Sequence, residues 1–441
     1  MTTLTIAPAH VPLQGQVTLP GDKSLSHRAA LFAALTRGES HIANFLDAGV
    51  TRPLLRALRE LGISWQLADG QLIVRGPGLA ALPQPTQPPT LFCGHSATTM
   101  RLLAGFLAAA GWPAVLDGSP GLRRRPMRRI TQPLQQMGVP ITDTEGHAPL
   151  ILQPRPRPRA LRGLDYTLPV ASAQVKTALL LAALAADSPT TLTEPGPSRD
   201  HTERFFQAMG LPLTRPAPHT VRLTPPVPQV LPPLHLTLPG DISSAAFLIA
   251  AALLVPGSRL TLTRVLLNPT RTGFLDALQR MGAQLTITPQ GETYGEPFGD
   301  ITVAYSPRLH GITIRGDLVV RMVDEFPAFA IVAAAAQGET LVRDAAELRH
   351  KESDRITAIV SRLQRLGVTA QALPDGFRIV GGRGWRGATL TADGDHRIAM
   401  AFAVAGLAAQ SPITLTDAEI ITQSFPTFAD TLRTLGAHLT P

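Results

Sequence analysis

The 441-residue sequence has no long hydrophobic run and only one cysteine, and each scarcity argues against a class of protein. Its longest apolar run, 245–255, is well short of the roughly 18 residues of a membrane span. Cys93 alone cannot form an internal disulfide, which is typical of a reducing compartment. The first residues show neither the basic nor the apolar region of a signal peptide. These features together predict a cytoplasmic protein without transmembrane helices.

Aromatic residues make up only 5% of the chain and are not interleaved with the basic residues. The arginine-rich stretches 123–129 and 155–162 leave a basic nucleic-acid-binding protein as one alternative. Such a protein usually offers aromatic side chains on which bases stack, and no such platform is visible here. The histidines also lack the paired spacing of metal ligands. We therefore expect no metal, no other cofactor and no nucleic-acid partner.

Lysine is scarce as well. Only Lys23, Lys176 and Lys351 occur among the 40 lysine and arginine residues, and the net charge is +8. Because the two residue types solvate a surface about equally well, a lysine in this chain indicates a place that needs a compact ammonium or a titratable amine. The positive net charge favours acidic partners without specifying them.

A short pattern recurs six times along the chain. A hydrophobic residue followed by glycine appears at intervals of 69 to 85 residues, with the glycines at positions 62, 138, 210, 282, 367 and 436. An amphipathic helical stretch precedes each glycine, which is the usual left-handed stop of a helix. Alternating segments such as 71–75 follow and predict strands. Proline-rich stretches at 82–89 and 154–159 are expected to be turns or strand edges.

A second pattern opens each repeat with small polar residues, followed by a helix rich in alanine and leucine. The six openings begin near residues 21, 94, 170, 240, 323 and 394. These helices are apolar on nearly all sides, which predicts that they are buried. Each repeat is therefore an α/β unit of the order β-α-β-α-β-β, and every apolar helix is expected to start at Gly, Ser, Thr, Asp or Ala.

Six repeats and a length beyond the roughly 250–300 residues of a single core predict two domains of three repeats. The sequence Leu-Pro-Gly-Asp occurs at 19–22 and again at 238–241, and marks where the chain changes domain. The prediction is an N-terminal domain of residues 21–238 and a C-terminal domain of residues 1–20 plus 239–441. Closure around substrates would hinge at Pro20–Gly21 and Pro239–Gly240.

Charged residues concentrate at the helix openings. They occur at 23–28, 95–101, 123–125, 176, 199–201, 324–325, 349–355 and 393–397. Helix N-termini carry partial positive charge and accept phosphate or carboxylate groups. Arginine forks bind the same anions in a bidentate manner. This combination predicts an enzyme that binds small, multiply charged anions.

The ordered motifs resemble those of the 5-enolpyruvylshikimate-3-phosphate synthases, and the resemblance covers essentially the whole chain. The matching segments are 21–28 (GDKSLSHR), 97–101 (ATTMR), 125–127 (RPM), 171–174 (ASAQ), 198–201 (SRDH), 351–355 (KESDR) and 395–397 (DHR). The resemblance implies two inside-out α/β domains in a chain expected to be monomeric. It also implies transfer of the enolpyruvyl group of phosphoenolpyruvate to the 5-hydroxyl of shikimate 3-phosphate, with release of phosphate, in aromatic amino-acid biosynthesis.

The same resemblance assigns substrate contacts. It implies that both substrates meet the opening motif at Lys23, Ser24 and Arg28. The matching shikimate 3-phosphate contacts are Ser172, Ala173, Gln174, Ser198 and Arg199, with Lys351 on the same substrate. The matching phosphoenolpyruvate contacts are Arg125, Arg355 and Arg397, and His396 lies in a matching substrate-binding motif.

Three residues are expected to carry the proton transfers. Asp324 matches an aspartate that faces the ring hydroxyls, and is the candidate base for the attacking 5-hydroxyl. Glu352 matches a glutamate that exchanges protons with the methylene carbon, as addition followed by elimination requires. Lys23 would assist at the leaving phosphate or at the hydroxyl. Structural ion pairs with nearby arginines are the alternative for both carboxylates.

The sequence departs from the family pattern at three positions. Gln423 stands where many relatives have a lysine before Phe-Pro, and His95 stands where asparagine is common. Ala97 replaces a glycine, as in the branch that tolerates glyphosate. We expect the Ala97 methyl group to crowd that bulkier inhibitor while it still admits phosphoenolpyruvate.

The closest alternative is the sister enolpyruvyl transferase that acts on UDP-N-acetylglucosamine. That enzyme relies on a loop cysteine and on a Lys-Asn pair at the first helix. Here Ser24 follows Lys23, and Cys93 precedes the glycine of the second opening. Because cysteine is among the most often buried residue types, Cys93 is expected to pack rather than react.

Overall fold

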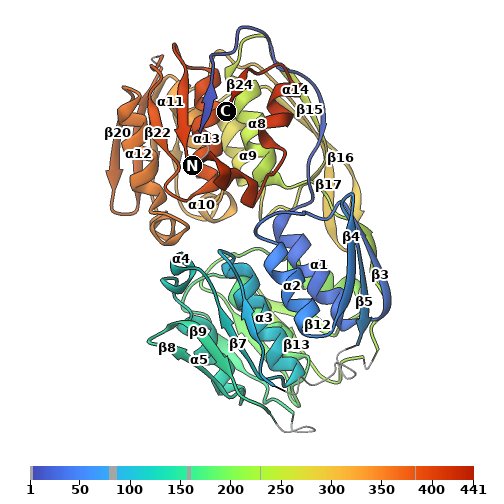
Figure 1. The fold of residues 1–441 in the computed structure, drawn as a ribbon. Helices are drawn as coiled ribbons and strands as arrows, with labels where there is room; N and C mark the ends of the chain where they lie inside the picture. Colours follow the sequence, from blue (N-terminus) through green and yellow to red (C-terminus); the bar gives the residue numbers. More distant parts are fainter. Residues whose placement is uncertain (1–2, 79–86, 156–159, 229, 383) are drawn as a thin grey trace. The chain divides into compact units, whose positions relative to one another are not determined.

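The computed structural model describes residues 3–78, 87–155, 160–228, 230–382 and 384–441. Parts of both proline-rich segments, 79–86 and 156–159, lie outside the described residues. The chain divides into two compact units (Figure 1). Unit 1 comprises residues 1–20, 239–291 and 297–441, and unit 2 comprises residues 21–238 and 292–296. The changes at 20/21 and 238/239 both fall within a Leu-Pro-Gly-Asp motif.

Unit 2 contains three four-stranded sheets of one design. Their orders are β14-β3-β5-β4, β6-β7-β9-β8 and β10-β11-β13-β12. The first has β14 (His235–Thr237), β3 (Arg37–Ala43), β5 (Gln71–Pro77) and β4 (Ser64–Ala68). The second has β6 (Thr90–Phe92), β7 (Ala114–Asp117), β9 (His147–Leu152) and β8 (Ile141–Thr144). The third has β10 (Asp165–Thr167), β11 (Thr190–Thr193), β13 (Thr220–Leu223) and β12 (Leu213–Ala217). In each, the first pair is parallel and the other pairs are antiparallel.

Unit 1 repeats this design three more times. Its sheets have the orders β16-β17-β15-β2, β18-β19-β21-β20 and β22-β23-β1-β24. The strands of the first are β16 (Leu285–Thr293), β17 (Glu296–Ala304), β15 (Arg259–Leu266) and β2 (Gln14–Thr18). Those of the second are β18 (Thr313–Ile314), β19 (Gly338–Val342), β21 (Gly376–Gly381) and β20 (Thr369–Leu373). Those of the third are β22 (Thr389–Thr391), β23 (Ile413–Thr416), β1 (Leu4–Ile6) and β24 (Leu439–Thr440).

The two Leu-Pro-Gly-Asp motifs exchange a pair of strands. Strand β2 leads into the first helix of unit 2, yet it pairs in parallel with β15 of unit 1. Strand β14 leads into α8 (Ile242–Leu254), the first helix after the chain returns to unit 1, yet it pairs in parallel with β3 of unit 2. The last repeat takes its final strand, β1, from the start of the chain, where it pairs with β23 and β24. The predicted β-α-β-α-β-β unit is thus present six times.

The six apolar helices are buried as predicted. They are α1 (Lys23–Leu35), α3 (Ala97–Ala110) and α6 (Ala173–Ala183) in unit 2, and α8 (Ile242–Leu254), α11 (Phe326–Ala335) and α13 (His396–Leu407) in unit 1. Within unit 1, α8, α11 and α13 pack against one another (Figure 1). None of the helices in the described ranges is long and apolar enough to cross a membrane.

Side chains cap five of these six helices. Asp22, Ser96, Ser172, Asp241 and Asp395 each accept a hydrogen bond from a backbone N–H of the first turn. The fifth helix, α11, differs from the prediction of a small residue at every start. Its N-cap residue, Glu325, makes no side-chain cap bond, and Pro327 in the first turn supplies the preset helical φ instead.

The second helix of each repeat is amphipathic, with buried apolar residues and exposed polar residues. These helices are α2 (Arg52–Glu60), α5 (Arg128–Gln136), α7 (His201–Ala208), α9 (Gly273–Arg280), α12 (Arg355–Arg365) and α14 (Phe428–Thr434). The glycine after each has a φ between 77° and 107°, which confirms the predicted left-handed stops. Four further short helices within the described part of the chain were not expected: α4 (Pro120–Arg123), α10 (Asp317–Arg321), η2 (Ala346–His350) and η3 (Ala418–Gln423).

The tip of the β16–β17 hairpin belongs to unit 2, although the predicted C-terminal domain included it. The Glu296 carboxylate contacts His201, with Oε1 lying 2.8 Å from Nδ1. The Tyr294 ring stacks on Phe205 at 5.5 Å between centroids. Arg204 donates to the carbonyl of Gly295 at 2.6 Å. Residues 292–296 are therefore held by α7 and its neighbours in unit 2.

Gly105 permits the close packing of α3 on α6. A Cβ atom added at this position would lie 2.2 Å from the carbonyl oxygen of Ala178, which is backbone and cannot swing away. We expect Gly105→Ala to lower the free energy of unfolding by about 1–3 kcal/mol, because overpacking outweighs the gain in helix propensity. Urea unfolding measures this change. Gly196→Ala is the matched control, since nothing lies within 4 Å of the added atom; equal stability of the two variants would contradict the prediction.

Candidate active site

The first opening, in unit 2, presents Lys23 and Ser24 at the start of α1. The Asp22 carboxylate accepts the Leu25 N–H at 2.9 Å and so fixes this turn. Arg28, one and a half turns later, is buried. Its Nε donates to Thr202 at 2.8 Å, its Nη2 to Thr177 at 2.8 Å and its Nη1 to the Ser24 carbonyl at 3.1 Å. The guanidinium therefore joins α1 to α6 and α7.

Charges in the interior of unit 2 keep Arg28 protonated. Burial lowers the pKa of Arg28 to about 10, against the opposing effect of the carboxylates Glu203, Asp22 and Glu296. At neutral pH this guanidinium is still a cation. It remains able to attract an anion at the start of α1, although it donates to Thr202, Ser24 and Thr177 inside the unit.

His27 lies in the opening motif 21–28, but the sequence did not predict a role for it. It is fully buried, and its Nδ1 lies 2.7 Å from the Lys23 carbonyl while its Nε2 lies 3.0 Å from the Val50 carbonyl and 3.2 Å from Thr99 Oγ1. Burial lowers the pKa of His27 to about 4, so the ring is neutral at neutral pH. The imidazole thus ties the start of α1 to the start of α3.

The second and third openings are connected through Arg101. Its Nη1 donates to Gln174 Oε1 at 2.6 Å, and its Nη2 donates to the Pro126 carbonyl at 3.0 Å. Gln174 in turn donates to Thr98 Oγ1 at 2.9 Å. Ala97 lies at the start of the same helix and is buried. Arg101 therefore holds Gln174 near Ala97 and fixes the loop that carries Arg125.

A carboxylate connects the predicted shikimate 3-phosphate contacts Ser172 and Ser198. Glu194 accepts the Ser172 N–H at 2.8 Å through Oε1 and the Ser198 hydroxyl at 2.8 Å through Oε2. Ser172 caps α6, which Ala173 begins, and Arg199 follows Ser198 in the loop before α7. The structure thus brings the third opening and the Ser198 loop together, and Glu194 is a second residue that the sequence did not reveal.

In unit 1, Arg355 lies at the centre of the charged residues. Its side chain is 1% exposed. Nε donates to Asp395 Oδ2 at 2.8 Å, Nη2 to Glu352 Oε2 at 2.8 Å and to Asp395 Oδ1 at 3.2 Å, and Nη1 to Asp324 Oδ1 at 3.4 Å. One guanidinium therefore brings together both predicted acid–base carboxylates and a third, Asp395.

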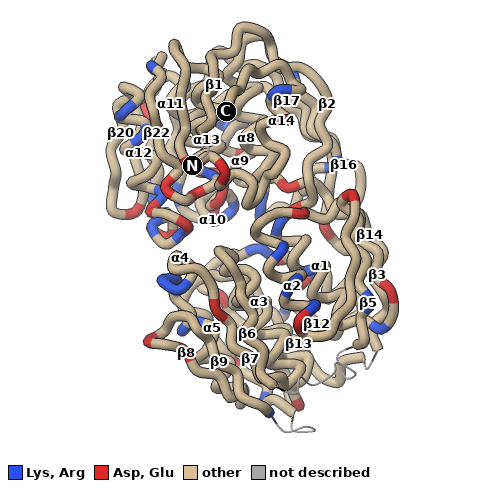
Figure 2. Tube along the Cα trace, viewed as in Figure 1, with Lys and Arg blue, Asp and Glu red and all other residues tan. Residues whose placement is uncertain are grey.

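Two further cations surround Asp324. Lys351 Nζ lies 3.8 Å from Asp324 Oδ1, and Arg397 Nη2 lies 3.9 Å from Oδ2. Arg397 also donates to the Asp324 carbonyl at 3.3 Å. His396, the first residue of α13, is buried beside Arg397 in sequence. Acidic and basic residues gather beside α10 in unit 1 (Figure 2).

Asp395 was missed by the sequence analysis and organises this cluster. It caps α13 by accepting the Arg397 N–H at 2.9 Å, and it accepts from Ser353 Oγ at 3.1 Å as well as from Arg355. Burial would raise the pKa of Asp395, but the Arg355 guanidinium holds it below its usual value. Burial likewise opposes the charge of Arg355, while Asp395 and Glu352 raise its pKa. Both groups are therefore ionised.

A second buried cluster lies at Glu325, the residue that follows Asp324. Glu325 accepts from the Ser243 hydroxyl, and Arg271 Nη2 donates to Ser243 Oγ at 2.9 Å. The same Nη2 lies 3.6 Å from Asp241 and 3.7 Å from Glu325. This cluster fastens the start of α11 to the start of α8, and so fixes the backbone at Asp324.

The remaining residues singled out from the sequence have simpler surroundings. Cys93 is buried, and burial raises the pKa of its thiol, which fits the predicted packing role. Gln423 ends η3 and is half-buried. No group of three or more His, Cys, Asp or Glu side chains within the described ranges is arranged to hold a metal ion.

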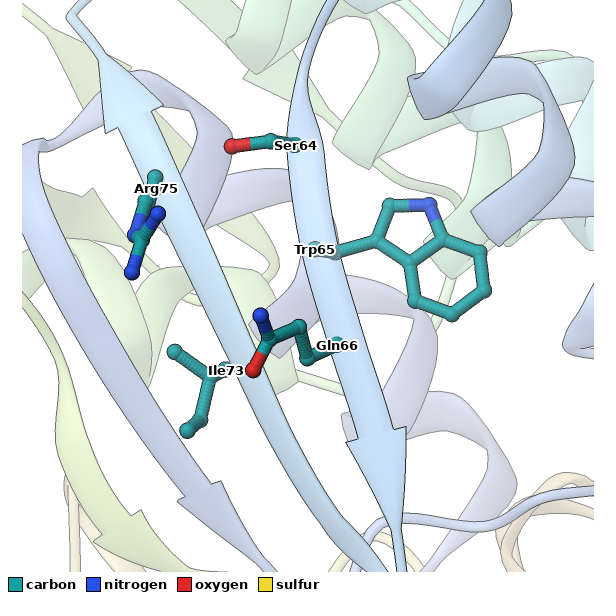
Figure 3. Close-up of a pocket in the computed structure, with 5 residues that line it drawn as sticks. All are labelled: Ser64, Trp65, Gln66, Ile73 and Arg75. Carbon is teal, nitrogen blue, oxygen red and sulfur yellow. The ribbon is translucent and has the colours of Figure 1, made fainter.

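A surface pocket lies away from these residues, on the β4–β5 pair of unit 2 (Figure 3). Ser64, Trp65, Gln66, Ile73 and Arg75 line it. Trp65 donates its indole N–H to the Leu55 carbonyl and has Arg59 stacked over its ring, and Arg75 pairs with Glu39. The pocket contains no predicted site residue.

The arrangement in unit 1 suits proton transfer next to anions. Asp324 and Glu352 share a single guanidinium, while Lys351, Arg355 and Arg397 supply positive charge around them. Carboxyl groups held near cations can accept a proton from a hydroxyl or exchange one with carbon. The openings of unit 2 supply hydroxyls, backbone N–H groups and cations suited to a phosphate.

Comparisons of the sequence with known proteins give one family. The EPSP synthase (3-phosphoshikimate 1-carboxyvinyltransferase) family model matches residues 8–432. A 3-phosphoshikimate 1-carboxyvinyltransferase from Roseiflexus castenholzii is 47% identical over 96% of this chain and 97% of its own length. One from Geobacter metallireducens is 45% identical over 99% of this chain and all of its own.

Solved structures give the same result. EPSP synthase from Acinetobacter baumannii superposes with a TM-score of 0.88 at 38% identity, over the full length of both chains. The enolpyruvyl transferase NikO from Streptomyces tendae has a TM-score of 0.79 at 20% identity over 99% of this chain and 98% of its own, and is similar in fold. The predicted enolpyruvyl transferase fold is confirmed. Matched from residue 8 to residue 432 and over the whole of its fold, the chain belongs to the EPSP synthase (3-phosphoshikimate 1-carboxyvinyltransferase) family.

Proposed function

We propose that this enzyme transfers the enolpyruvyl group of phosphoenolpyruvate to the 5-hydroxyl of shikimate 3-phosphate and releases inorganic phosphate, as a step of aromatic amino-acid biosynthesis. The observation that carries the proposal is the cluster at Arg355, where Asp324 and Glu352 accept from one buried guanidinium. A reaction that adds a hydroxyl to a carbon–carbon double bond and then expels phosphate needs two such carboxylates.

The binding roles divide between the two units. Shikimate 3-phosphate is assigned mainly to unit 2, with the residues Lys23, Ser24, Arg28, Ser172, Ala173, Gln174, Ser198 and Arg199, and also to Lys351. Phosphoenolpyruvate is assigned to the guanidinium groups of Arg125, Arg355 and Arg397, and the assignment also includes Ala97 and His396. The four hydrogen bonds of Arg355 within unit 1 leave one N–H direction, on Nη1, among the described residues. Arg355 can therefore donate one hydrogen bond to the anion while it holds the carboxylates in place.

The proton transfers follow from these positions. Asp324 accepts the proton of the 5-hydroxyl as its oxygen forms a bond to C2 of phosphoenolpyruvate. Glu352, which is protonated at the start of the cycle, gives a proton to C3 in the same step, which yields a tetrahedral intermediate. Glu352 then takes a proton back from C3 as the C2–O bond to phosphate breaks. Lys23, as an ammonium, stabilises the leaving phosphate. The proton on Asp324 leaves with the released phosphate, so that both carboxyl groups return to their starting state.

Phosphate release measures the proposed reaction. Purified enzyme with both substrates should release phosphate, and omission of either substrate should abolish the release. Absence of release from folded enzyme would contradict the proposal. UDP-N-acetylglucosamine in place of shikimate 3-phosphate then tests the sister reaction. The sister enzyme relies on a loop cysteine, whereas Cys93 of this chain is buried.

The Ala97 methyl group provides a separate test of the phosphoenolpyruvate side. We expect Ala97→Gly to strengthen inhibition by glyphosate about 10-fold or more, because a methyl group in a close-fitting pocket discriminates by about 1–3 kcal/mol. The Michaelis constant for phosphoenolpyruvate should change by less than about 3-fold. Inhibition measured against varied phosphoenolpyruvate gives both values. Ala108→Gly makes the same substitution later in α3, at a buried position outside the site, and should leave inhibition unchanged.

We further infer that the enzyme acts in the cytoplasm as a monomer, without a cofactor and without binding nucleic acid. The single cysteine supports the reducing compartment, and the scarcity of aromatic residues supports the absence of nucleic-acid binding. Light scattering after size-exclusion chromatography tests the monomer. Salt-sensitive retention on immobilised DNA would contradict the absence of nucleic-acid binding.

A further inference from the structure

Lys176, one of the three lysines, lies in a buried charge cluster that the proposed reaction leaves unused. Its side chain on α6 is 4% exposed, and Nζ lies 2.6 Å from Glu194 Oε2 and 2.7 Å from Glu203 Oε1. Both carboxylates are buried as deeply as the amine. Burial opposes the charge on Lys176, but Glu203 and Glu194 raise its pKa above the usual value. The amine is therefore an ammonium.

Glu194 contacts two predicted substrate-binding segments as well as the buried Lys176. Oε1 accepts the Ser172 N–H and Oε2 accepts the Ser198 hydroxyl, each at 2.8 Å. Oε2 also accepts from Lys176. One carboxylate thus sets the position of two groups that lie on different segments, the cap of α6 and the loop before α7. Both segments carry predicted contacts to shikimate 3-phosphate.

The charges in this interior balance. Arg28 and Lys176 are cations, Glu194 and Glu203 are anions, and Glu203 is the carboxylate with the largest effect on Arg28. Thr177 and Thr202, which accept from Arg28, lie 2.6 Å from each other. The further charged or titratable side chains nearby are Asp22, Arg199, Asp200, His201, Arg204 and Glu296. An uncompensated charge at such a buried position strongly destabilises the fold.

We propose that Glu194 is a positioning residue for shikimate 3-phosphate, acting through Ser172 and Ser198, and that Lys176 neutralises it. The proposal rests on the proposed function. A carboxylate beside groups that bind a phosphate dianion would repel that anion unless a cation compensates it. A compact ammonium can contact two carboxylates where a planar guanidinium would need more room, which explains a lysine in a chain that otherwise favours arginine.

Two single variants with the same formal charge separate positioning from folding. Glu203→Gln leaves the Glu194 carboxylate on Ser172 and Ser198, still paired with Lys176. Glu194→Gln leaves Lys176 paired with Glu203, but its new amide cannot accept from both the Ser172 N–H and the Ser198 hydroxyl as Glu194 does. Each variant removes one anion from the same cluster and keeps the ammonium. They differ in the group that holds the two serines.

The readout is the Michaelis constant for each substrate, from phosphate release. We expect the variant that loses Glu194 to raise the constant for shikimate 3-phosphate about 10-fold or more over the variant that loses Glu203. The constant for phosphoenolpyruvate should agree within about 2-fold between them. Wild-type enzyme serves as the reference, and failure of wild type to turn over would count against the proposed function alone.

Three results would overturn the positioning role. The first is an equal Michaelis constant for shikimate 3-phosphate in both variants. The second is an equal rise for both substrates, which would indicate a general loss of active structure. The third is a failure of either variant to fold, checked by thermal unfolding, because it would assign the cluster to stability rather than to binding.

Discussion

Glu352→Gln should lower kcat for phosphate release by about 10²–10⁴-fold, the range typical of a lost general acid–base group. Glutamine cannot exchange a proton with the methylene carbon. It can still accept from Arg355 Nη2, which now donates to Glu352 Oε2 at 2.8 Å, so the fold should be retained. Phosphate release at saturating concentrations of both substrates measures the effect.

Glu347→Gln is the matched control for this variant. Glu347 lies on η2, five residues before Glu352, and is exposed. It should release phosphate at the wild-type rate. If Glu352→Gln also kept that rate within about 3-fold, the enzyme would still be the proposed transferase, but another residue would carry the proton to C3.

Arg355→Met should have the largest effect on stability, and should also abolish turnover. We expect the free energy of unfolding to fall by about 3–5 kcal/mol, because removal of one partner leaves buried carboxylates without their cation. Asp395, whose side chain is 0% exposed, loses two hydrogen bonds, and Glu352 and Asp324 lose one each. Urea unfolding at pH 7.5 measures the loss.

The loss should depend on pH in a defined direction. In the wild-type enzyme Arg355 holds the pKa of Asp395 below its unfolded value, so this carboxylate stabilises the fold above that value and stops doing so as the pH falls through the lower folded pKa. Without Arg355, burial dominates and raises the pKa of Asp395 above the unfolded value. The destabilisation is then largest at neutral pH and shrinks toward pH 5. A difference that stayed constant between pH 7.5 and pH 5 would contradict this account.

Arg378→Met is the control for the loss of an arginine. Arg378 pairs with Glu339 at the surface, and its side chain is 43% exposed. Such exposed pairs contribute about 0–1 kcal/mol, so the variant should unfold close to the wild type. A loss equal to that of Arg355→Met would mean that burial of the cluster does not set its energetic role.

The repeated architecture could be predicted from the sequence because the patterns that indicate it are local. The six glycines that end the amphipathic helices adopt the predicted left-handed φ, and the apolar helices are buried as their composition indicates. Caps such as Asp22 and Ser96 also follow from their neighbours in sequence. The fifth start differs because Glu325 is engaged by Ser243, a residue 82 positions away.

The site residues that the sequence missed are those defined by distant contacts. Glu194 lies in no motif of the chain, and its role appears only when Ser172, Lys176 and Ser198 meet it. Asp395 belongs to a motif, but its bond to Arg355, 40 residues away, depends on how α12 packs near α13. The short helices escaped prediction because four to six residues give no periodic signal.

The pairing of β1 with β24 has a consequence for synthesis on the ribosome. Domains generally fold as units while the chain emerges from its N-terminus. Strand β1 (Leu4–Ile6) is made long before its partner β24 (Leu439–Thr440). Unit 1 therefore cannot complete its last sheet until β24 has been made. Unit 2 has all its strands once β14 has been made, and its last residues, 292–296, also precede β24 by a long stretch of chain. The nascent chain should thus carry a finished unit 2 while β1 still waits for its partner.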